Sequence, residues 1–492
     1  MSRQVCLAVD LGAGSGRVVA GIHDGATLGL REIRRFANDP VRDPSGWHWQ
    51  IDRLFSEIKS ALADAAREFG SDLVSVGVDS WGVDYGLLDD RGILLGAPFQ
   101  YRDSRTDGRE AEAAKRMPLD EIYRRTGIQF MFFNTLFQLM AERESPQGLL
   151  GKADRILFTP DLIHYLLSGR MAVERSIAST SQLLDAASGR WDRGLIAAFD
   201  FPVKIFGEIV DAGTDLGELR PELKAELGIG SLRVIAPGAH DTASAVAGIP
   251  ADVAQPVFLS SGTWSLFGRE LAAPILTEAA RAGGFSNEAG VLGTTRFLKN
   301  IAGMWLLQEC KRVWDSAGPE IGYDELIAAA AEAAPFAAYL DPDAPDFQAP
   351  EDMTAAIAAY LARTGQPAIS EPAQVTRLIL EGLALKYRQS ATLLESLTGQ
   401  PIAKVHIVGG GAKNRLLNQF AADALGCPVV AGPVEATSVG NILMQLLALG
   451  KISSLAEGRA LVRKSFETTT FEPRDRAAWD AAYDSYLSLQ TT

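Results

Sequence analysis

A short apolar strand that runs into a small-residue loop and then into a second strand occurs twice in this chain. The first copy has a strand at 5–11, the glycine-rich loop at 12–16 and a second strand at 18–22. The second copy has strands at 257–261 and 265–268, joined by Gly262, Thr263 and Trp264. Recurrence of one supersecondary unit far along a chain indicates a repeated architecture. It therefore predicts two α/β domains built on one plan.

The segments around the two hairpins extend this prediction. A third strand at 28–36 completes an antiparallel meander, and 51–69 carries apolar residues at helical spacing and ends at Gly70. Further strands are expected at 73–78 and 405–408, and the stretch 334–352 reads as a loop. The other expected helices lie near 104–116, 134–144, 160–168, 192–198, 243–247, 301–316, 353–364, 374–397, 416–425 and 441–449. We place the domain boundary between residues 245 and 246, which gives domains at 1–245 and 246–492.

Composition narrows the class of partner. The 492 residues carry a net charge of −14, which disfavours a sequence-independent nucleic-acid binder. Apolar runs fall short of the ~18 residues of a membrane helix, so we expect no membrane association. The three cysteines, Cys6, Cys310 and Cys427, lie far apart and form no CxxC pair. Free thiols of this kind are typical of a reducing compartment, which predicts a cytoplasmic protein that acts on small molecules.

The first glycine loop, GAGSGR at 12–17, is followed by a strand rather than a helix. This excludes a Rossmann dinucleotide loop, and the absence of GxxxxGK[ST] excludes a P-loop. Backbone N–H groups and Arg17 could hold phosphate here, or the glycines could serve only a tight turn. Asp10, at the end of the preceding strand, could organise Mg²⁺ through water or simply cap that turn.

Four further segments each allow a functional and a purely structural interpretation. The run DSWGVD at 79–84 suits a polyhydroxylated ligand, or it is a core tryptophan between solvated aspartates. Asp241, in HDT at 240–242, is either a general base or a helix N-cap. The loops SSGT at 260–263 and GGG at 409–411 are individually plain turns. Taken together with Asp10 and Asp241, the loops indicate nucleotide phosphates held between two domains.

The chain resembles the FGGY carbohydrate kinases nearly from end to end. The matching segments are VDLGAGSGR at 9–17, GVDSWGVDYGLLD at 77–89, YRDSRT at 101–106, TGIQF at 126–130, FNTLFQL at 133–139, HDTASAVA at 240–247, SSGTWSL at 260–266, RFLKNI at 296–301, WLLQE at 305–309, LKYR at 385–388, HIVGGGAKNRLLNQ at 406–419 and AGPVEAT at 431–437. The segments at 126–139 and 296–309 resemble the branch of the family that phosphorylates L-rhamnulose. Gly14 departs from the family pattern, in which serine is common, so one possible hydroxyl donor to phosphate is missing.

This resemblance implies a fold of two ribonuclease H-like (actin-like) α/β domains with the active-site cleft between them. It implies transfer of the γ-phosphoryl group of ATP to the 1-hydroxyl of L-rhamnulose, with Asp241 as catalytic base and Asp10 organising Mg²⁺. The residues implied to hold ATP are Ala13, Gly14, Ser15, Gly16, Arg17, Thr263, Gln308 and Gly410. Those implied to hold the sugar are Gly82, His240, Asp241, Thr242 and Asn300.

Two alternatives stay open beside this reading. The chain could phosphorylate another ketose, such as fuculose or xylulose. It could also be a non-catalytic actin-like sensor of sugar or nucleotide, although the presence of Asp10 and Asp241 disfavours that role. The expected partners are a small sugar and ATP, and the sequence leaves the oligomeric state open.

Overall fold

The computed structural model describes residues 3–348 and 350–489, and it divides into two compact units. Unit 1 combines three segments of the chain, Met1–Ala254, Glu270–Phe297 and Ala436–Phe466. Unit 2 combines Gln255–Arg269, Leu298–Glu435 and Glu467–Thr492. Residues 436–466, which the sequence places in the second domain, thus pack with the first unit.

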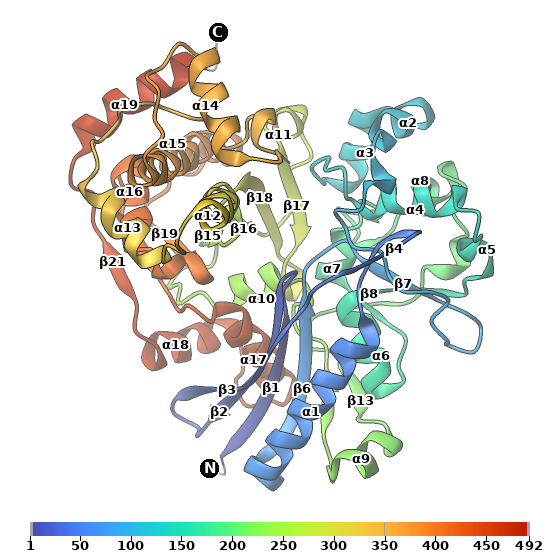
Figure 1. Cartoon of the computed structure of the whole chain (residues 1–492). Helices are drawn as coiled ribbons and strands as arrows, with labels where there is room; N and C mark the ends of the chain where they lie inside the picture. Colours follow the sequence, from blue (N-terminus) through green and yellow to red (C-terminus); the bar gives the residue numbers. More distant parts are fainter. Residues whose placement is uncertain (1–2, 349, 490–492) are drawn as a thin grey trace. The chain divides into compact units, whose positions relative to one another are not determined.

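Unit 1 is built on a six-stranded sheet of order β13-β14-β6-β1-β2-β3 (Figure 1). The meander β1–β2–β3 is antiparallel, β6 and β14 are parallel to β1, and β13 is antiparallel to β14. The strand bounds are β1 Gln4–Leu11, β2 Ser15–His23, β3 Leu28–Ala37, β6 Leu73–Ser80, β13 Asp215–Glu218 and β14 Arg233–Ile235. The first meander and the strand after the long helix are therefore confirmed.

The second sheet has seven strands in the order β17-β18-β16-β15-β19-β20-β21. Here too, β15 pairs antiparallel with the strand that follows it and parallel with β19, and β20 is parallel to β19. The bounds are β15 Val257–Ser261, β16 Trp264–Leu271, β17 Phe285–Ala289, β18 Thr295–Ala302, β19 Val405–Val408, β20 Val429–Ala431 and β21 Thr469–Phe471. The repeat of hairpin plus parallel strands confirms the prediction of two sheets on one plan.

The helices and the minor strands complete the fold. The helices are α1 Ile51–Phe69, α2 Arg109–Arg116, α3 Leu119–Thr126, α4 Thr135–Glu144, α5 Leu149–Lys152, α6 Thr159–Ser168, α7 Arg175–Ser179, α8 Arg193–Ala198, α9 Pro221–Leu227, α10 Asp241–Ala247, α11 Glu278–Ala282, α12 Trp305–Ala317, α13 Tyr323–Glu332, α14 Met353–Arg363, α15 Pro372–Thr398, α16 Arg415–Leu425, α17 Ala436–Ala448, α18 Leu455–Ser465 and α19 Arg476–Leu489. The short strands are β4 Val41–Asp43, β5 Gly46–His48, β7 Tyr85–Leu88, β8 Arg155–Phe158, β9 Val173–Glu174, β10 Leu184–Asp185, β11 Arg190–Trp191 and β12 Ile209–Val210. None of the helices in the described ranges is long and apolar enough to cross a membrane.

Some predicted helix bounds were wrong. The expected helix at 301–316 begins only at Trp305, because β18 continues through the buried Ile301 to Ala302. The expected helix at 104–116 is a short 3₁₀ turn followed by α2, because Gly108 adopts a φ of 75° between them. The expected helix at 441–449 begins earlier, at Ala436, because the small residues before Asn441 belong to the helix and do not form a turn.

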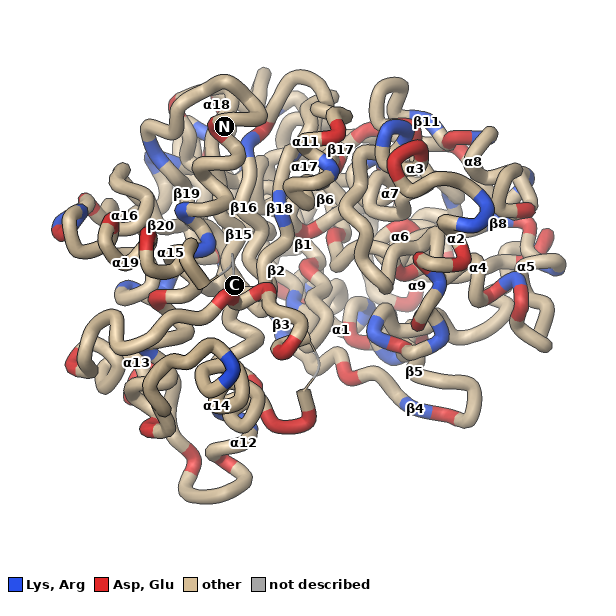
Figure 2. Tube along the Cα trace, turned by 90° about the horizontal axis from the view of Figure 1, so that it is seen from above, with Lys and Arg blue, Asp and Glu red and all other residues tan. Residues whose placement is uncertain are grey.

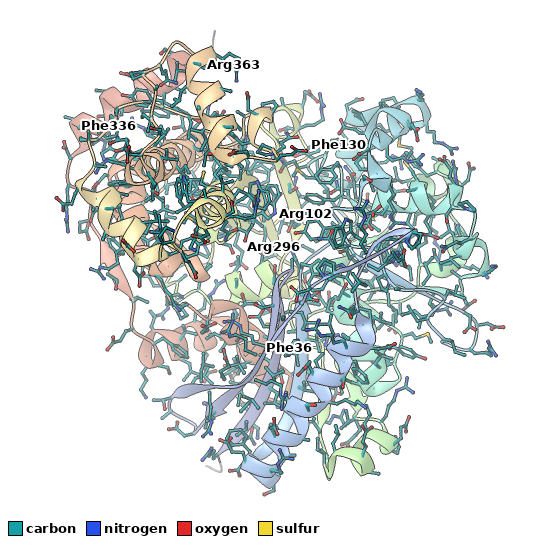
Figure 3. All side chains as sticks on the ribbon, viewed as in Figure 1. Phe36, Arg102, Phe130, Arg296, Phe336 and Arg363 are labelled. Carbon is teal, nitrogen blue, oxygen red and sulfur yellow. The ribbon has the colours of Figure 1, made fainter. Side chains whose placement is uncertain are left out.

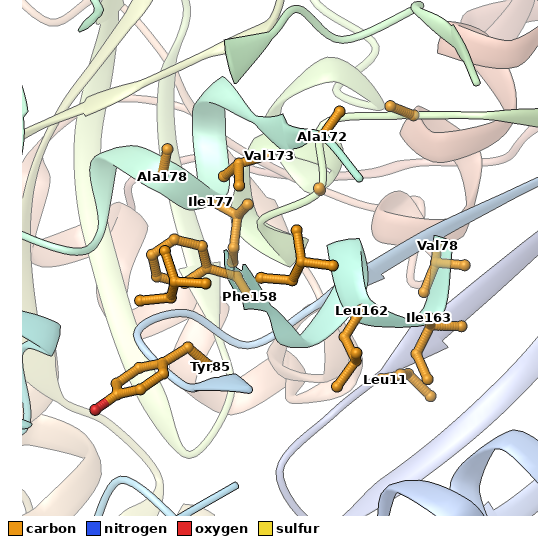
Figure 4. Packing of buried hydrophobic residues seen from close by; sticks show 14 of the residues in the cluster. Leu11, Val78, Tyr85, Phe158, Leu162, Ile163, Ala172, Val173, Ile177 and Ala178 are labelled. Atoms are coloured by element: carbon orange, nitrogen blue, oxygen red, sulfur yellow. The ribbon is translucent and has the colours of Figure 1, made fainter. Parts of the chain in front are cut away.

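The apolar core of unit 1 lies between its sheet and the surrounding helices. Figure 4 shows part of this packing, where Leu11 and Val78 of the sheet lie near Leu162 and Ile163 of α6. Helix α1 buries one apolar stripe, consisting of Ile51, Leu54, Ile58, Ala61, Leu62, Ala65 and Phe69. Each large side chain buried in this way contributes about 1.5–3 kcal/mol of transfer free energy. The three cysteines are free and buried, as expected.

Helix α17 packs on β1, β6 and α10 within unit 1 (Figure 1). A Cβ added at Gly440 would overlap the carbonyl oxygen of Ser244 in α10, so only glycine allows this approach. The polar face of α17 is satisfied by the sheet, since Gln445 donates to the Leu7 carbonyl at 2.9 Å and accepts from Ser75 at 2.7 Å. A segment late in the sequence therefore helps to support α10, the helix that begins at Asp241.

Candidate functional site

Three carboxylates of unit 1 lie where its central strands end. Asp10 and Asp79 are opposite each other in the parallel pair β1–β6, and β6 continues into a bridge between Ser80 and His240. The Ser80 N–H donates to the Ala239 carbonyl at 2.9 Å, which places the start of α10 beside β6. The carboxyl ends of parallel strands share one edge of a sheet, where ligand sites of α/β folds form. Asp10, Asp79 and Asp241 thus share one neighbourhood.

The surroundings raise the pKa of two of these carboxylates, Asp79 and Asp241. Burial raises the pKa of Asp79 well above its usual range, and the charges of Asp10 and Asp241 raise it further, although Asn441 opposes this with a 2.5 Å hydrogen bond. Burial likewise raises the pKa of Asp241, with the nearby Asp10 adding to the effect and His240 opposing it. Mutually repelling carboxylates at a strand end are typical of sites that receive a cation or a proton.

Asp241 is not the N-cap of α10. The helix begins at Asp241, and His240 occupies the N-cap position without a side-chain capping bond. The Asp241 carboxylate accepts a hydrogen bond from the Thr242 hydroxyl at 3.0 Å, and its side chain is 33% exposed. The capping alternative is therefore wrong, and a partly accessible carboxylate is left for chemistry.

Asp10 does not cap the turn that follows it. The turn is closed by the Gly12 N–H, which donates to the Ser15 carbonyl at 2.9 Å. The Asp10 Oδ2 instead accepts from Arg17 Nε at 2.9 Å and Nη2 at 2.6 Å, across the β1–β2 pair. Arg17, expected to hold phosphate, is thus engaged with Asp10 in this structure. Asp10 Oδ2 also accepts from the Ser438 hydroxyl of α17 at 3.4 Å.

The tip of the β1–β2 hairpin presents the predicted phosphate loop to solvent. Gly14 and Ser15 are exposed, and Gly14 has no atom within 4 Å of an added Cβ. Gly16 is different, because a Cβ there would strike the ring of Phe36. Ala13, half-buried, lies between these positions. The glycines thus serve two purposes: Gly14 leaves the tip open, and Gly16 allows Phe36 to pack closely against the hairpin.

The segment after β6 carries a rigid aromatic and amide cluster. Asp84 accepts from the indole N–H groups of Trp49 at 2.6 Å and Trp81 at 2.9 Å, and from Gln138 at 2.9 Å. Burial raises the Asp84 pKa to about 6, although these hydrogen bonds oppose the shift. Gly82, between the cluster and the end of β6, is packed on Thr180 at 3.1 Å from an added Cβ.

Unit 2 brings together three of the predicted nucleotide residues. The loop after β15 is held by the residues at the start of α12, because the N–H groups of Gly303 and Trp305 donate to the Thr263 carbonyl at 3.1 and 3.2 Å. Gln308 lies in the first turn of α12. The loop after β19 packs on Ser261, since a Cβ at Gly411 would overlap the Ser261 hydroxyl. The loop that contains Thr263, the start of α12 and the loop after β19 therefore meet at the end of β15.

Asn300 lies in β18 of unit 2 and is half-buried. The other predicted sugar residues, Gly82, His240, Asp241 and Thr242, belong to unit 1. The predicted site residues do not include Asp79, Asp84 or Asn441, whose buried polar contacts appear only in the folded chain. The sequence signals for Asp79 and Asp84 are their position after a buried strand and the run DSWGVD at 79–84 that contains both.

Known protein families match both halves of the chain. Residues 5–248 match the model of the N-terminal domain of the FGGY family of carbohydrate kinases, and residues 257–449 match that of its C-terminal domain. The chain belongs to the FGGY family of carbohydrate kinases. Its mixed α/β architecture with two sheets is accordingly an FGGY kinase fold, and FGGY kinases use ATP as a substrate.

Curated relatives match this FGGY kinase over nearly their full length. It is 43% identical to a rhamnulokinase of Bacteroides thetaiotaomicron, with 98% of each chain covered. It is 40% identical to a rhamnulokinase of Enterobacter sp. (96% of this chain, 95% of the relative). A rhamnulokinase of Bacillus subtilis is 37% identical, with 95% of each chain covered.

Solved structures of a xylulose kinase and a glycerol kinase share the fold at low identity. A ligand-bound xylulose kinase from Lactobacillus acidophilus aligns with a TM-score of 0.84 at 14% identity, covering 99% of this chain and 98% of that one. A Plasmodium falciparum glycerol kinase with ADP aligns with a TM-score of 0.76 at 15% identity, covering 99% and 97%. At such identities the likeness shows the fold alone.

Proposed function

We propose that this FGGY kinase transfers the γ-phosphoryl group of ATP to the 1-hydroxyl of L-rhamnulose, which makes it a rhamnulokinase. The observation that carries the choice of sugar is its identity of 37–43% to proteins named rhamnulokinase, over 95–98% of this chain. The carboxylates at the strand ends of unit 1 support the chemistry, because phosphoryl transfer depends on positioning and charge more than on covalent steps.

Asp241 is the proposed catalytic base. It would accept the proton of the attacking sugar hydroxyl, a task for which its raised pKa is suited because a base works best when its pKa approaches the working pH. Its carboxylate is partly exposed, so a hydroxyl can reach it, and it keeps the Thr242 hydrogen bond at 3.0 Å. His240, Thr242, Gly82 and Asn300 would bind the sugar.

The residues of unit 1 also fit a magnesium ion. Asp79 Oδ1 is buried without a hydrogen-bond partner, and Asp10 supplies a second carboxylate beside it. Two carboxylates suffice for Mg²⁺, because it keeps water and phosphate oxygens as its other ligands. When bound, the ion would neutralise charge on the transferring phosphate. Asp10 would organise it, directly or through water.

The nucleotide would be held by three small-residue loops and a helix. The open tip of the first hairpin, from Ala13 to Gly16, offers backbone N–H groups to phosphate. Arg17 would add a charged donor there once it is released from Asp10. In unit 2, Thr263, Gln308 and Gly410 would hold the remainder of ATP, which is supported by the meeting of their loops and of the start of α12 at the end of β15.

The charge distribution and the free thiols bear on the partners and the cellular location of this enzyme. Figure 2 shows basic and acidic residues interspersed along the trace, an arrangement that suits small ligands better than nucleic acid. A cytoplasmic location is supported by the three buried free thiols, which are typical of reducing compartments.

A substrate panel tests this function. Purified enzyme, ATP and Mg²⁺ are assayed by coupled ADP detection with L-rhamnulose, L-fuculose and D-xylulose. We expect the highest kcat/KM for L-rhamnulose, since buried polar groups discriminate strongly against a misplaced hydroxyl. Tenfold better turnover of another ketose would overturn the sugar assignment. Absence of sugar-dependent ADP formation with every sugar would favour the sensor alternative.

A further inference from the structure

A buried ion pair, Glu288 and Arg296, contacts the ring of His240. His240 is the one residue proposed to bind sugar or ATP that this pair is described as contacting. Arg296 of β18 is fully buried, and Figure 3 labels it. Its Nη1 lies 3.0 Å from Oε2 of Glu288, which is in β17 and only 8% exposed. Buried charges of this kind are costly to maintain unless they are paired, so a pair beside an active-site histidine calls for an explanation.

The pair restricts where the His240 ring carries its proton. Arg296 Nη2 lies 3.0 Å from His240 Nδ1, and a guanidinium can only donate. This contact has hydrogen-bond geometry, whereas Glu288 Oε2 forms no hydrogen bond with any described residue, so the geometry favours Nδ1 as the acceptor and the proton of the neutral ring on Nε2. Nε2 is the nitrogen that faces Asp241, with its Oδ1 at 3.4 Å. Glu288 Oε2 also lies 3.2 Å from Nδ1, but it forms no hydrogen bond there and is paired with the guanidinium at 3.0 Å.

The backbone of His240 is held by other groups, so the ion pair acts on the ring alone. The His240 N–H donates to the Ser176 hydroxyl at 3.1 Å, and the Ala239 N–H donates to Glu174 at 3.0 Å. The guanidinium is itself anchored, because Arg296 Nε donates to the Ala289 carbonyl at 3.1 Å. Removal of the pair would therefore leave the chain path in place and free the imidazole.

We propose that Glu288 and Arg296 are positioning residues that hold His240 as the Nε2–H tautomer, so that its N–H points at the carboxylate of Asp241. The consequence for catalysis rests on the proposed function of Asp241 as base. A fixed N–H beside Asp241 orients its carboxylate and favours the ionised form that accepts the sugar proton. Partners that set the tautomer of a functional histidine are a recurring device in enzyme sites.

The first test reads the tautomer directly and does not depend on activity. The chain has five histidines, so ¹⁵N-histidine labelling with long-range ¹H–¹⁵N correlation is tractable, and His240→Gln assigns the signal. We expect wild-type His240 to show a protonated Nε2 and an unprotonated, hydrogen-bonded Nδ1. A ring protonated at Nδ1 at neutral pH would overturn the proposal.

Variants then connect the pair to the tautomer. In Glu288→Gln/Arg296→Met, which replaces both charges with side chains of similar size, we expect the His240 signal to become a mixture of tautomers. An unchanged signal in a folded variant would overturn the proposal. Arg296→Lys provides a second variant, because lysine keeps the charge but cannot bridge both partners with two Nη groups. If neither variant folds, the wild-type spectrum alone decides.

A double-mutant cycle tests the link to catalysis. We expect Glu288→Gln/Arg296→Met, which removes both charges, to lower kcat by about 10- to 100-fold, as loss of a supporting partner does in other enzyme sites. The KM for ATP should stay within about twofold. In the Asp241→Asn background the same replacement should cost nothing further, because the base it supports is gone. An equal loss in both backgrounds would indicate a purely structural role and overturn the proposal.

A matched control uses another buried pair of the same residue types. Arg377 and Glu381 of α15 lie 2.6 Å apart in unit 2, with 11% and 2% exposure. Arg377→Met/Glu381→Gln should lower the melting temperature but leave kcat and the His240 signal unchanged. If wild-type enzyme fails to phosphorylate L-rhamnulose, the proposed function fails, whereas the tautomer spectrum still tests the ion pair.

Discussion

The two strand–loop–strand hairpins share a backbone plan and differ in charge. In the first, Asp10 and Arg17 lie directly opposite each other and are joined by two hydrogen bonds. In the second, residues 257–266 contain no charged side chain. There Ser265 exchanges a 2.8 Å hydrogen bond with Tyr387, and Ser261 packs against the 409–411 loop.

This difference indicates a division of labour. Charged groups are needed where phosphate charge changes during transfer, and in a chain of net charge −14 they must be supplied locally. Neutral hydroxyl and backbone donors suffice where a ligand is only held. We therefore propose that the hairpin of unit 1 acts on the transferring phosphate whereas the hairpin of unit 2 only holds the nucleotide, and the following predictions test that distinction.

The largest effect is expected for Asp241, the proposed catalytic base in unit 1. Asp241→Asn should lower kcat by about 10²–10⁴, because a positioned base contributes this much. Both KM values should stay within a few-fold and the melting temperature should barely move, since Asp241 is not a cap and an asparagine amide can keep the contacts with the Thr242 hydroxyl and with His240 Nε2. Steady-state kinetics and thermal unfolding check this. Retention of more than about a tenth of wild-type kcat would exclude the role.

The two loops should respond unequally to loss of a donor. Arg17→Ala should raise the KM for ATP by about 10- to 150-fold, which corresponds to about 1.5–3 kcal/mol for a hydrogen bond to a charged group. The matched change in unit 2, Thr263→Ala, should raise it by only about 2- to 13-fold, as for a neutral hydrogen bond. Both are read from ATP titrations at saturating sugar. Equal effects would break the proposed distinction between charged and neutral loops.

The pH profile of unit 1 chemistry follows from the raised pKa of Asp241. The base must be ionised, so kcat/KM for the sugar should fall about tenfold per pH unit below that pKa. Because burial and Asp10 raise it above the ordinary 3.8, the fall should begin at a higher pH than for a free aspartate. The residual activity of Asp241→Asn should lack this acid limb. A limb that persists in the variant would assign it to another group.

The smallest effect is expected at the open tip of the first hairpin. Gly14→Ala should change the free energy of unfolding by less than about 0.5 kcal/mol, because an added Cβ meets no atom within 4 Å. Gly16→Ala is the contrast, since its Cβ would strike Phe36 and overpacking costs about 1–3 kcal/mol. Denaturant unfolding measures both. A large loss at Gly14 would show that the tip is not open.

Much of the architecture could be predicted from local patterns. Apolar periodicity located α1 at 51–69 to the residue, because a helix that buries one face repeats every 3.6 residues. The same pattern failed at residues 301–302, where a strand runs into a helix and apolar residues suit both. It also missed the start of α17, whose Gly440 resembles a loop residue but is required by the approach to Ser244.

The sequence by itself determined the repeated hairpin, the small-residue loops and the carboxylates that end the strands, because these depend on residues close together in the chain. Only the tertiary structure decided that Arg17 engages Asp10, that Asp241 is not a cap, and that Arg296 and Glu288 meet His240. It also decided that residues 436–466 pack with unit 1. The physical reason is that side chains far apart in sequence are brought within hydrogen-bond distance by packing, which leaves no periodic trace in the chain.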